Sequence, residues 1–146
     1  MEGKLDLVNF MDSLFDIKGI VVITGAIGLM GKHHTRAVLE HNGSVALIDI
    51  DINKLEDFKS ILKSEGYKGI HIYSCDITDK KNVEAVLEDL SNKHLPIVGL
   101  INNAANNPKI EDNESLNFSR LENFNLEIWQ NDLNVGLLGS FLCIKY

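Results

Sequence analysis

Three glycines and one acid have the types and spacing of a site for a phosphate-bearing ligand. Gly25, Gly28 and Gly31 recur at every third position, directly after the apolar run 20–23. Main-chain N–H groups at the start of a helix can bind phosphate without any basic side chain, and glycine leaves them accessible. Asp49 follows further along the chain, and its carboxylate can accept hydrogen bonds from sugar hydroxyls. This pattern predicts a nucleotide site, provided that the surrounding elements are a strand and then a helix.

Four short apolar segments predict the strands of such a fold. The runs at 20–23, 45–48 and 97–101 are apolar at every position or nearly so, which is typical of parallel strands covered on both faces. The segment 70–75 instead alternates, with Ile70 and Ile72 on one side, and therefore predicts an edge strand.

The segments between these strands have apolar residues at helical spacing, which predicts helices there. We expect Thr78 to cap the third helix with Asp79 in its first turn, and Asn125 to cap the last, with Glu127 in its first turn. The predicted helices span 29–41, 55–66, 83–90 and from 125 towards the end of the chain.

Alternating strands and helices with short connections predict an α/β fold with right-handed crossovers. We expect a Rossmann-type, doubly wound parallel sheet of four strands in the order 3-2-1-4, with helices on both faces. Residues 1–18 form a lead-in, and 19–146 form the nucleotide-binding portion of one domain. The polar segment 106–123 lacks periodicity, and we expect a surface excursion there.

Each glycine has a separate expected task. Gly25 permits the sharp turn out of the first strand, Gly28 lets a pyrophosphate approach the main chain, and Gly31 lets the helix pack closely on the strand. Asp49 would hold both ribose hydroxyls of the adenosine and repel a phosphate on the 2′ position. Since Ile50 is not basic, and no lysine or arginine lies between the glycines, NAD is favoured over NADP. The alternative is that Asp49 only caps the next helix.

Composition excludes several other classes of function. The formal net charge of −7 disfavours nucleic acid and anionic membranes as partners. No apolar run approaches the length of a membrane-spanning helix. Cys75 and Cys143 are too few and too far apart for a disulfide framework or a metal site, so we expect reduced thiols in a cytoplasmic protein and no metal.

Four motifs in the same order resemble the short-chain dehydrogenase/reductase family. They are Thr24-Gly-Ala-Ile-Gly-Leu-Met-Gly, Cys75-Asp-Ile-Thr-Asp, Ile101-Asn-Asn-Ala-Ala, and Trp129 placed five residues before Asn134. The resemblance implies an NAD(P)-dependent oxidoreductase acting on a secondary alcohol or ketone of a polar small molecule, for instance a sugar. It implies that Asn134 is catalytic and holds a water in a proton relay, at a helix kink that exposes a carbonyl. It also implies cofactor contacts from Thr24, Gly25, Gly28, Leu29, Met30, Gly31, Asp49, Ile50, Asp76, Ile77, Asn103, Ala104 and Ala105.

The sequence departs from that family's usual pattern in two places within these motifs. The TGxxGxxG spacing is typical of the extended branch, which contains sugar-nucleotide epimerases and dehydratases, and it puts Leu29 where short-form enzymes have glycine. Ala105 replaces the last glycine of the family's NNAG motif. The combination is similar to oxidoreductases of flagellin modification, whose substrates are thought to be sugars.

The family's proton donor is absent from the sequence. No Tyr-x-x-x-Lys occurs in the chain, and Tyr146 is too near Asn134 to take that part. We therefore expect the N-terminal portion of a longer enzyme that is inactive alone, with strand 4 left as a bare edge. In full-length relatives the Asn134 helix contributes to a dimer interface, which implies a homo-oligomer. The alternatives are a non-catalytic dinucleotide-binding module and an NAD-dependent sugar-nucleotide epimerase or dehydratase.

Overall fold

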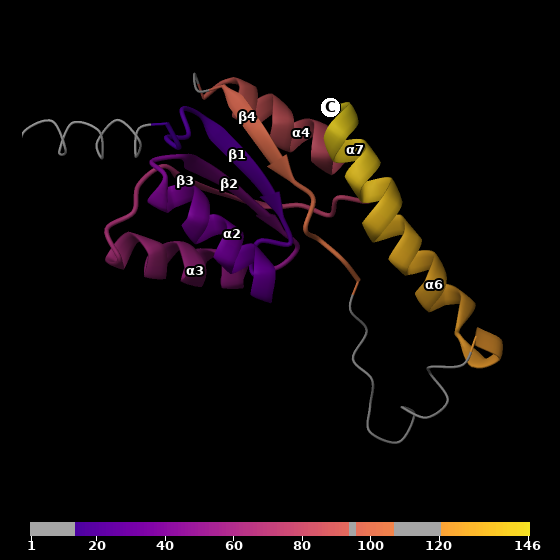
Figure 1. Ribbon diagram of the computed structural model, residues 1–146. Helices are drawn as coiled ribbons and strands as arrows, with labels where there is room; N and C mark the ends of the chain where they lie inside the picture. Colours follow the sequence, from indigo (N-terminus) through magenta and orange to yellow (C-terminus); the bar gives the residue numbers. More distant parts are fainter. Residues whose placement is uncertain (1–13, 94–95, 107–120) are drawn as a thin grey trace, which may run out of the picture.

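The computed structural model describes residues 14–93, 96–106 and 121–146. Most of the predicted lead-in, and most of the surface excursion predicted at 106–123, lie outside these ranges. The described residues form one parallel sheet with helices on both faces (Figure 1).

The sheet has the predicted strand order, β3-β2-β1-β4, and every neighbouring pair is parallel. β1 lies in the centre, where all five of its residues are buried because helices cover both of its faces. The strands are β1 (Ile20–Thr24), β2 (Ser44–Asp49), β3 (Ile70–Ser74) and β4 (Ile97–Ile101).

β4 departs from the expectation that both of its faces are covered. Ile97 and Val98 are 44% and 51% exposed, since β4 pairs with β1 along one side only. An apolar run of five residues therefore predicted the strand correctly but overstated its burial. The expected bare edge is confirmed for the described residues.

Two apolar cores lie on opposite faces of the sheet, because successive side chains of β1 point in opposite directions. Val21 and Ile23 pack with residues of α2 (Leu29–Glu40) and α3 (Ile52–Ser64). Ile20 and Val22 pack with residues of α4 (Lys80–Ser91) and with Leu142. Figure 1 shows α2 and α3 together on one side of the sheet, and α4 and α7 on the other.

One of the predicted helix caps is wrong. Asp79, and not Thr78, is the N-cap of α4, and its carboxylate accepts a hydrogen bond from Lys81 N. The Thr78 hydroxyl is instead engaged by Asp76, which accepts from both Oγ1 and N of Thr78 at 2.7 and 2.9 Å. Asn125 caps the last helical segment as predicted, since its Oδ1 accepts from Glu127 N at 2.7 Å.

The last helical segment changes geometry along its length. It begins as α6 (Leu126–Leu133), continues as the π-helical stretch Asn134–Gly139, and ends as α7 (Ser140–Lys145). The predicted departure from regular helix at Asn134 is confirmed, since the π-helical stretch starts at this residue. Gly139, the last residue of this stretch, packs closely on Ile77: a Cβ added there would come within 2.6 Å of Ile77 Cδ1, and the Ile77 side chain would have to move. Within the described ranges, no helix has the length and apolar character needed to cross a membrane.

Candidate functional site

The corner between β1 and α2 has the geometry that the three glycines predict. Gly25 adopts a φ of 62°, a conformation that costs other residues energy, and a Cβ there would lie 2.8 Å from Ala104 Cα. Gly28 is the N-cap of α2 and makes no side-chain cap hydrogen bond. The first N–H groups of α2 therefore face the cleft beside bare main chain, where an anion is favoured.

Gly31 fixes how closely α2 approaches the corner. A Cβ at this position would lie 2.8 Å from both the Cα and the carbonyl carbon of Ala26, and closer still to Gly25 O. These are main-chain atoms, so no side-chain rearrangement could relieve the contact. Close packing at Gly31 is confirmed, but it is against the turn that follows β1 and not against the strand itself.

Thr24 and Asn103 join the glycine corner to the loop after β4. The Thr24 hydroxyl accepts hydrogen bonds from the main-chain N–H groups of Asn103 and Ala104 at 3.0 and 3.1 Å. In the opposite direction, Asn103 Nδ2 donates to the carbonyl oxygens of Thr24 and Gly25 at 3.0 and 2.9 Å. Both residues therefore hold the positive-φ turn in place, and Thr24 is completely buried.

Asp49 ends β2 with its carboxylate held beside the glycine corner. Its Oδ2 accepts from Ile27 N at 3.3 Å, and its Oδ1 accepts from Ile50 N at 2.9 Å. The next helix is capped by Asp51, whose side chain accepts from Lys54 N. The alternative in which Asp49 caps that helix is therefore wrong.

These groups surround one cleft of about 720 Å³ at the carboxyl ends of β1 and β2. The strand order reverses between β1 and β4, and the carboxyl edge of an open parallel sheet beside such a reversal is the usual place for ligands in α/β folds. Most residues proposed for cofactor contact from the sequence line the cleft: Gly25, Gly28, Leu29, Met30, Asp49, Ile50, Asp76, Ile77, Asn103, Ala104 and Ala105.

Three of the predicted site residues do not line it. Thr24 and Gly31 lie behind its wall and shape it through the contacts described above. Asn134 is half-buried at the start of the π-helical stretch, while its neighbour Val135 reaches the cleft. The structure thus separates residues that support the corner from those that face a ligand.

Several residues that line the cleft were not predicted from the sequence, and of these Lys54 and Asn106 have polar side chains. Lys54 could have been found, because side chains in the first turn of a helix lean towards its N-terminus and hence towards the end of β2. Asn106 had no local signal. Its Nδ2 donates to Asp132 Oδ1 of α6 at 2.9 Å, a contact between residues far apart in the sequence.

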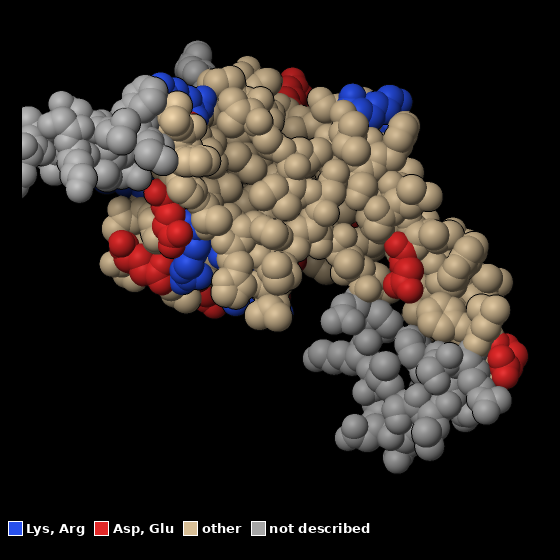
Figure 2. Space-filling view, viewed as in Figure 1, with Lys and Arg blue, Asp and Glu red and all other residues tan. Residues whose placement is uncertain are grey.

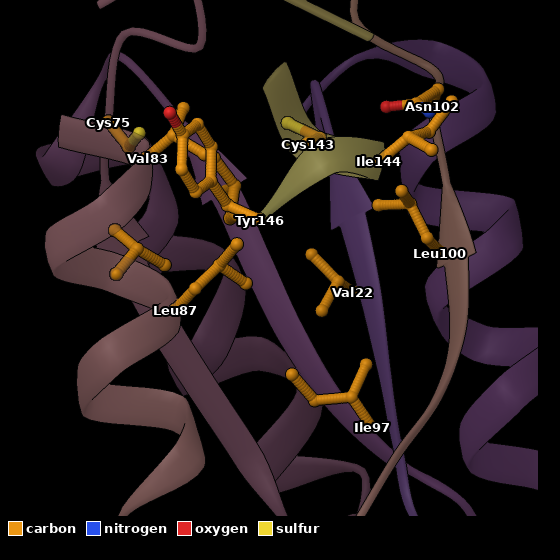
Figure 3. Close-up of a pocket in the computed structure, with 12 residues that line it drawn as sticks. Val22, Cys75, Val83, Leu87, Ile97, Leu100, Asn102, Cys143, Ile144 and Tyr146 are labelled. Atoms are coloured by element: carbon orange, nitrogen blue, oxygen red, sulfur yellow. The ribbon is translucent and has the colours of Figure 1, made fainter. Parts of the chain in front are cut away.

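A second, apolar cavity of about 540 Å³ lies on the other side of the sheet, between β1, β4, α4 and α7. Figure 3 shows Val22 and Leu100 of the sheet and Leu87 of α4 lining it, with Tyr146 above. Burial raises the pKa of Cys75, which borders both cavities, to about 11, and the nearby Cys143 adds to the effect. This cavity lacks the main-chain donors of the glycine corner.

Within the described ranges, no three His, Cys, Asp or Glu side chains gather as a metal site.

Comparison with known proteins agrees with this geometry. The family profile described as short chain dehydrogenase matches residues 19–146. The chain belongs to the short-chain dehydrogenase family. Members of this family use nicotinamide dinucleotides, and the matched range holds the whole glycine corner.

Individual relatives are more distant. A short chain dehydrogenase/reductase of Colletotrichum higginsianum is 27% identical over 86% of this chain and 43% of its own length. The post-translational flagellin modification protein A of Campylobacter coli is 29% identical over 58% of this chain and 33% of its own length. The chain therefore spans less than half of these curated relatives.

Solved structures share the fold at low sequence identity. A gluconate 5-dehydrogenase from Burkholderia cenocepacia, in complex with NADP and tartrate, superposes with a TM-score of 0.77, at 20% identity, over 92% of this chain and 49% of that one. An NAD⁺-bound xylitol dehydrogenase superposes with a TM-score of 0.71, at 21% identity, over 90% and 46%. One holds NAD and the other NADP, so the likeness does not decide between them.

Proposed function

We propose that this chain binds NAD in the cleft at the carboxyl ends of β1 and β2, as the cofactor-binding portion of a short-chain dehydrogenase. The observation that carries this proposal is the position of Asp49. Its carboxylate lies against the glycine corner, hydrogen-bonded to Ile27 N, where it can accept from ribose hydroxyls of a dinucleotide whose phosphates face Gly28. The same negative charge opposes a 2′-phosphate, which favours NAD over NADP.

The remaining cofactor contacts follow from the residues that line the cleft. Asp76 and Ile77 are proposed to contact the adenine, and Asn103 and Ala104 to face a cofactor ribose. When bound, the nicotinamide would accept or supply the hydride. Asn134 is proposed as the catalytic residue that holds a water in a proton relay, at the start of the π-helical stretch. Insertions of π-helix are frequent at functional sites, which supports a special task for this turn.

The proposed substrate of the whole enzyme is a secondary alcohol or ketone on a polar small molecule, with a sugar as the leading class. The relative named for flagellin modification and the structural neighbours named for gluconate and xylitol support this class. Since the sequence contains no Tyr-x-x-x-Lys, we expect this chain to bind NAD without oxidising a substrate. NADH formation from any member of a panel of sugars and polyols would contradict that expectation.

Calorimetric titration of NAD into the chain tests the binding site. Asp49→Ala should weaken NAD binding about tenfold or more, because it removes a charged acceptor of hydroxyl hydrogen bonds. Asp57→Ala on α3 removes the same charge at an exposed position away from the cleft, and should leave the affinity unchanged.

A second variant tests the phosphate contact. A Cβ at Gly28 would approach only Gly25 O, at 3.2 Å, so Gly28→Ala should fold with a small local adjustment. The added methyl group would nevertheless project where the pyrophosphate must approach the main chain, and NAD affinity should fall about tenfold. Unchanged affinity in both the D49A and G28A chains would refute the proposed site.

A further inference from the structure

Lys54 is a basic residue that lines the cleft, although the glycine motif at residues 24–31 contains no lysine or arginine. It is the third residue of α3, and its side chain lines the cleft together with Asp49 and Ile50. Its Nζ lies 2.8 Å from Asp51 Oδ2, and the lysine side chain is 69% exposed. The ammonium therefore lies at the mouth of the cleft, held by one carboxylate and near a second.

The charges around Lys54 act on one another. The hydrogen bond with Asp51 raises the pKa of Lys54, and the charge of Asp49 raises it further. Conversely, the hydrogen bond from Lys54 lowers the pKa of Asp51. Two carboxylates, those of Asp49 and Asp51, therefore face one ammonium at the end of β2.

Asp49 and Asp51 hold that charge in different ways. The Asp49 carboxylate accepts hydrogen bonds from two main-chain N–H groups, which hold it beside the glycine corner. Asp51 caps the helix through Oδ1, which accepts from Lys54 N, and its Oδ2 forms the ion pair with Lys54 Nζ. A phosphate entering beside Asp49 would meet a fixed negative charge. Lys54, the only cation among the described residues that line the cleft, is already paired with Asp51.

We infer that Lys54, through its ion pair with Asp51, sets how strongly this cleft rejects a phosphate on the adenosine 2′-hydroxyl. Paired with Asp51, it leaves Asp49 to exclude the phosphate. Released from Asp51, it supplies the cation that a 2′-phosphate needs. The inference rests on the proposed function, because it assumes that the adenosine ribose lies at Asp49. The Lys54–Asp51 ion pair would then be a determinant of the choice between NAD and NADP.

Asp51→Asn is the sharpest variant, because asparagine caps helices as well as aspartate does. The D51N chain keeps the fold and Asp49 but no longer neutralises Lys54. Its affinity for NADP should rise roughly three- to tenfold, the range expected when a freed cation meets a doubly charged phosphate near the surface. Its affinity for NAD should change less than twofold.

Two further chains serve as controls for that result. In D51N/K54A the gain in NADP affinity should disappear, because the cation is gone. Lys63→Ala removes the same charge from the last turn of α3, outside the cleft, and should change neither affinity. The D51N gain should also shrink as salt rises from about 0.05 M to 0.5 M, since screening weakens an exposed charge contact but not a structural effect.

Asp49→Asn gives a second reading that does not depend on Asp51. Removing the fixed negative charge should raise the NADP-to-NAD affinity ratio, and adding Lys54→Ala should lower that ratio again by roughly threefold or more. If both D51N and D49N bind NADP equally well with and without Lys54, the inference is wrong while NAD binding by the unchanged chain upholds the proposed function. If the unchanged chain binds neither dinucleotide, both are wrong.

Discussion

The two faces of the sheet differ in how completely their helices fill the space above the strands. On the face of α2 and α3, residues such as Ile23, Leu55 and Leu62 are fully buried in one continuous core. On the face of α4 and α7, a cavity of about 540 Å³ remains, and Phe141 and Ile144 of α7 are 55% and 70% exposed. The surface differs as well: Figure 2 shows charged side chains near α2 and α3, whereas the area over β4 is largely uncharged.

This difference explains why the glycine corner is well defined in so small a sheet. The corner is formed between β1 and α2, on the filled face, where main-chain atoms of Gly25, Ala26 and Gly31 contact one another directly. Packed interiors resist changes of volume, so the positions of the N–H groups that face the cleft are fixed by the core behind them.

Gly31→Ala should have the largest effect on stability. The added methyl group would overlap main-chain atoms of Ala26 that cannot move without opening the corner, so we expect a loss of about 3 kcal/mol or more in the free energy of unfolding. Urea denaturation followed by circular dichroism measures it.

Gly136→Ala is the matched control on the open face. A Cβ there would meet nothing within 4 Å, and alanine suits a helix better than glycine. The G136A chain should therefore be as stable as the unchanged chain or more stable by up to about 1 kcal/mol. Equal losses at both glycines would mean that the two faces do not differ in packing.

Truncation of one valine on each face compares the packing of the two faces with a smaller expected effect. Val38 of α2 and Val86 of α4 are 6% and 8% exposed, but Val86 borders the cavity whereas Val38 is surrounded by the α2–α3 core. Val38→Ala should cost about 2 kcal/mol, and Val86→Ala about 1 kcal/mol, since Val86 already lacks contacts on its cavity side. Both changes gain the same helix propensity, so the difference between their urea midpoints isolates the packing. Equal costs, or a larger one at Val86, would contradict the comparison.

Much of this fold could be predicted because its signals are local. Apolar runs gave the strands, and the glycine spacing with Asp49 located the corner. The parallel order 3-2-1-4 followed from alternating strands and helices together with the family resemblance. The cap of α4 was missed because Thr78 and Asp79 are adjacent and both favour that position. Only the structure shows that Asp76 engages the Thr78 hydroxyl and leaves Asp79 to cap.

The parts of the site that were missed depend on contacts between distant segments. Thr24 has the residue type of a ligand contact, yet its hydroxyl is taken up by the loop after β4, nearly eighty residues away. Asn106 gains its position from Asp132 in the same way. The cavity beside α4 could not be predicted either, because a residue pattern shows which side chains face inward and not whether they fill the space.

The last comparison leaves stability unchanged and concerns Cys75, whose reactivity reports whether the open face is dry. With a pKa of about 11 the thiol is ionised in only about one molecule in a thousand at pH 8, against about a quarter for an ordinary cysteine. Alkylation of Cys75 by iodoacetamide in a Cys143→Ser chain should therefore be slow at pH 8 and rise about tenfold per pH unit to near pH 11.

The shape of that pH profile reports the raised pKa of Cys75 more directly than the rate at one pH does. A thiolate of higher pKa is also the stronger nucleophile, so the rate at one pH recovers part of the lost reactivity. A free thiol compound measured in parallel should level off above about pH 9. Because Cys75 also borders the glycine-corner cleft, the profile is measured with NAD saturating that cleft. A plateau for Cys75 at the same pH would then show that water fills the apolar cavity and solvates the thiolate. The cavity between α4 and α7 would then be an open, wet groove, and the contrast between the two faces would be one of polarity and not of packing.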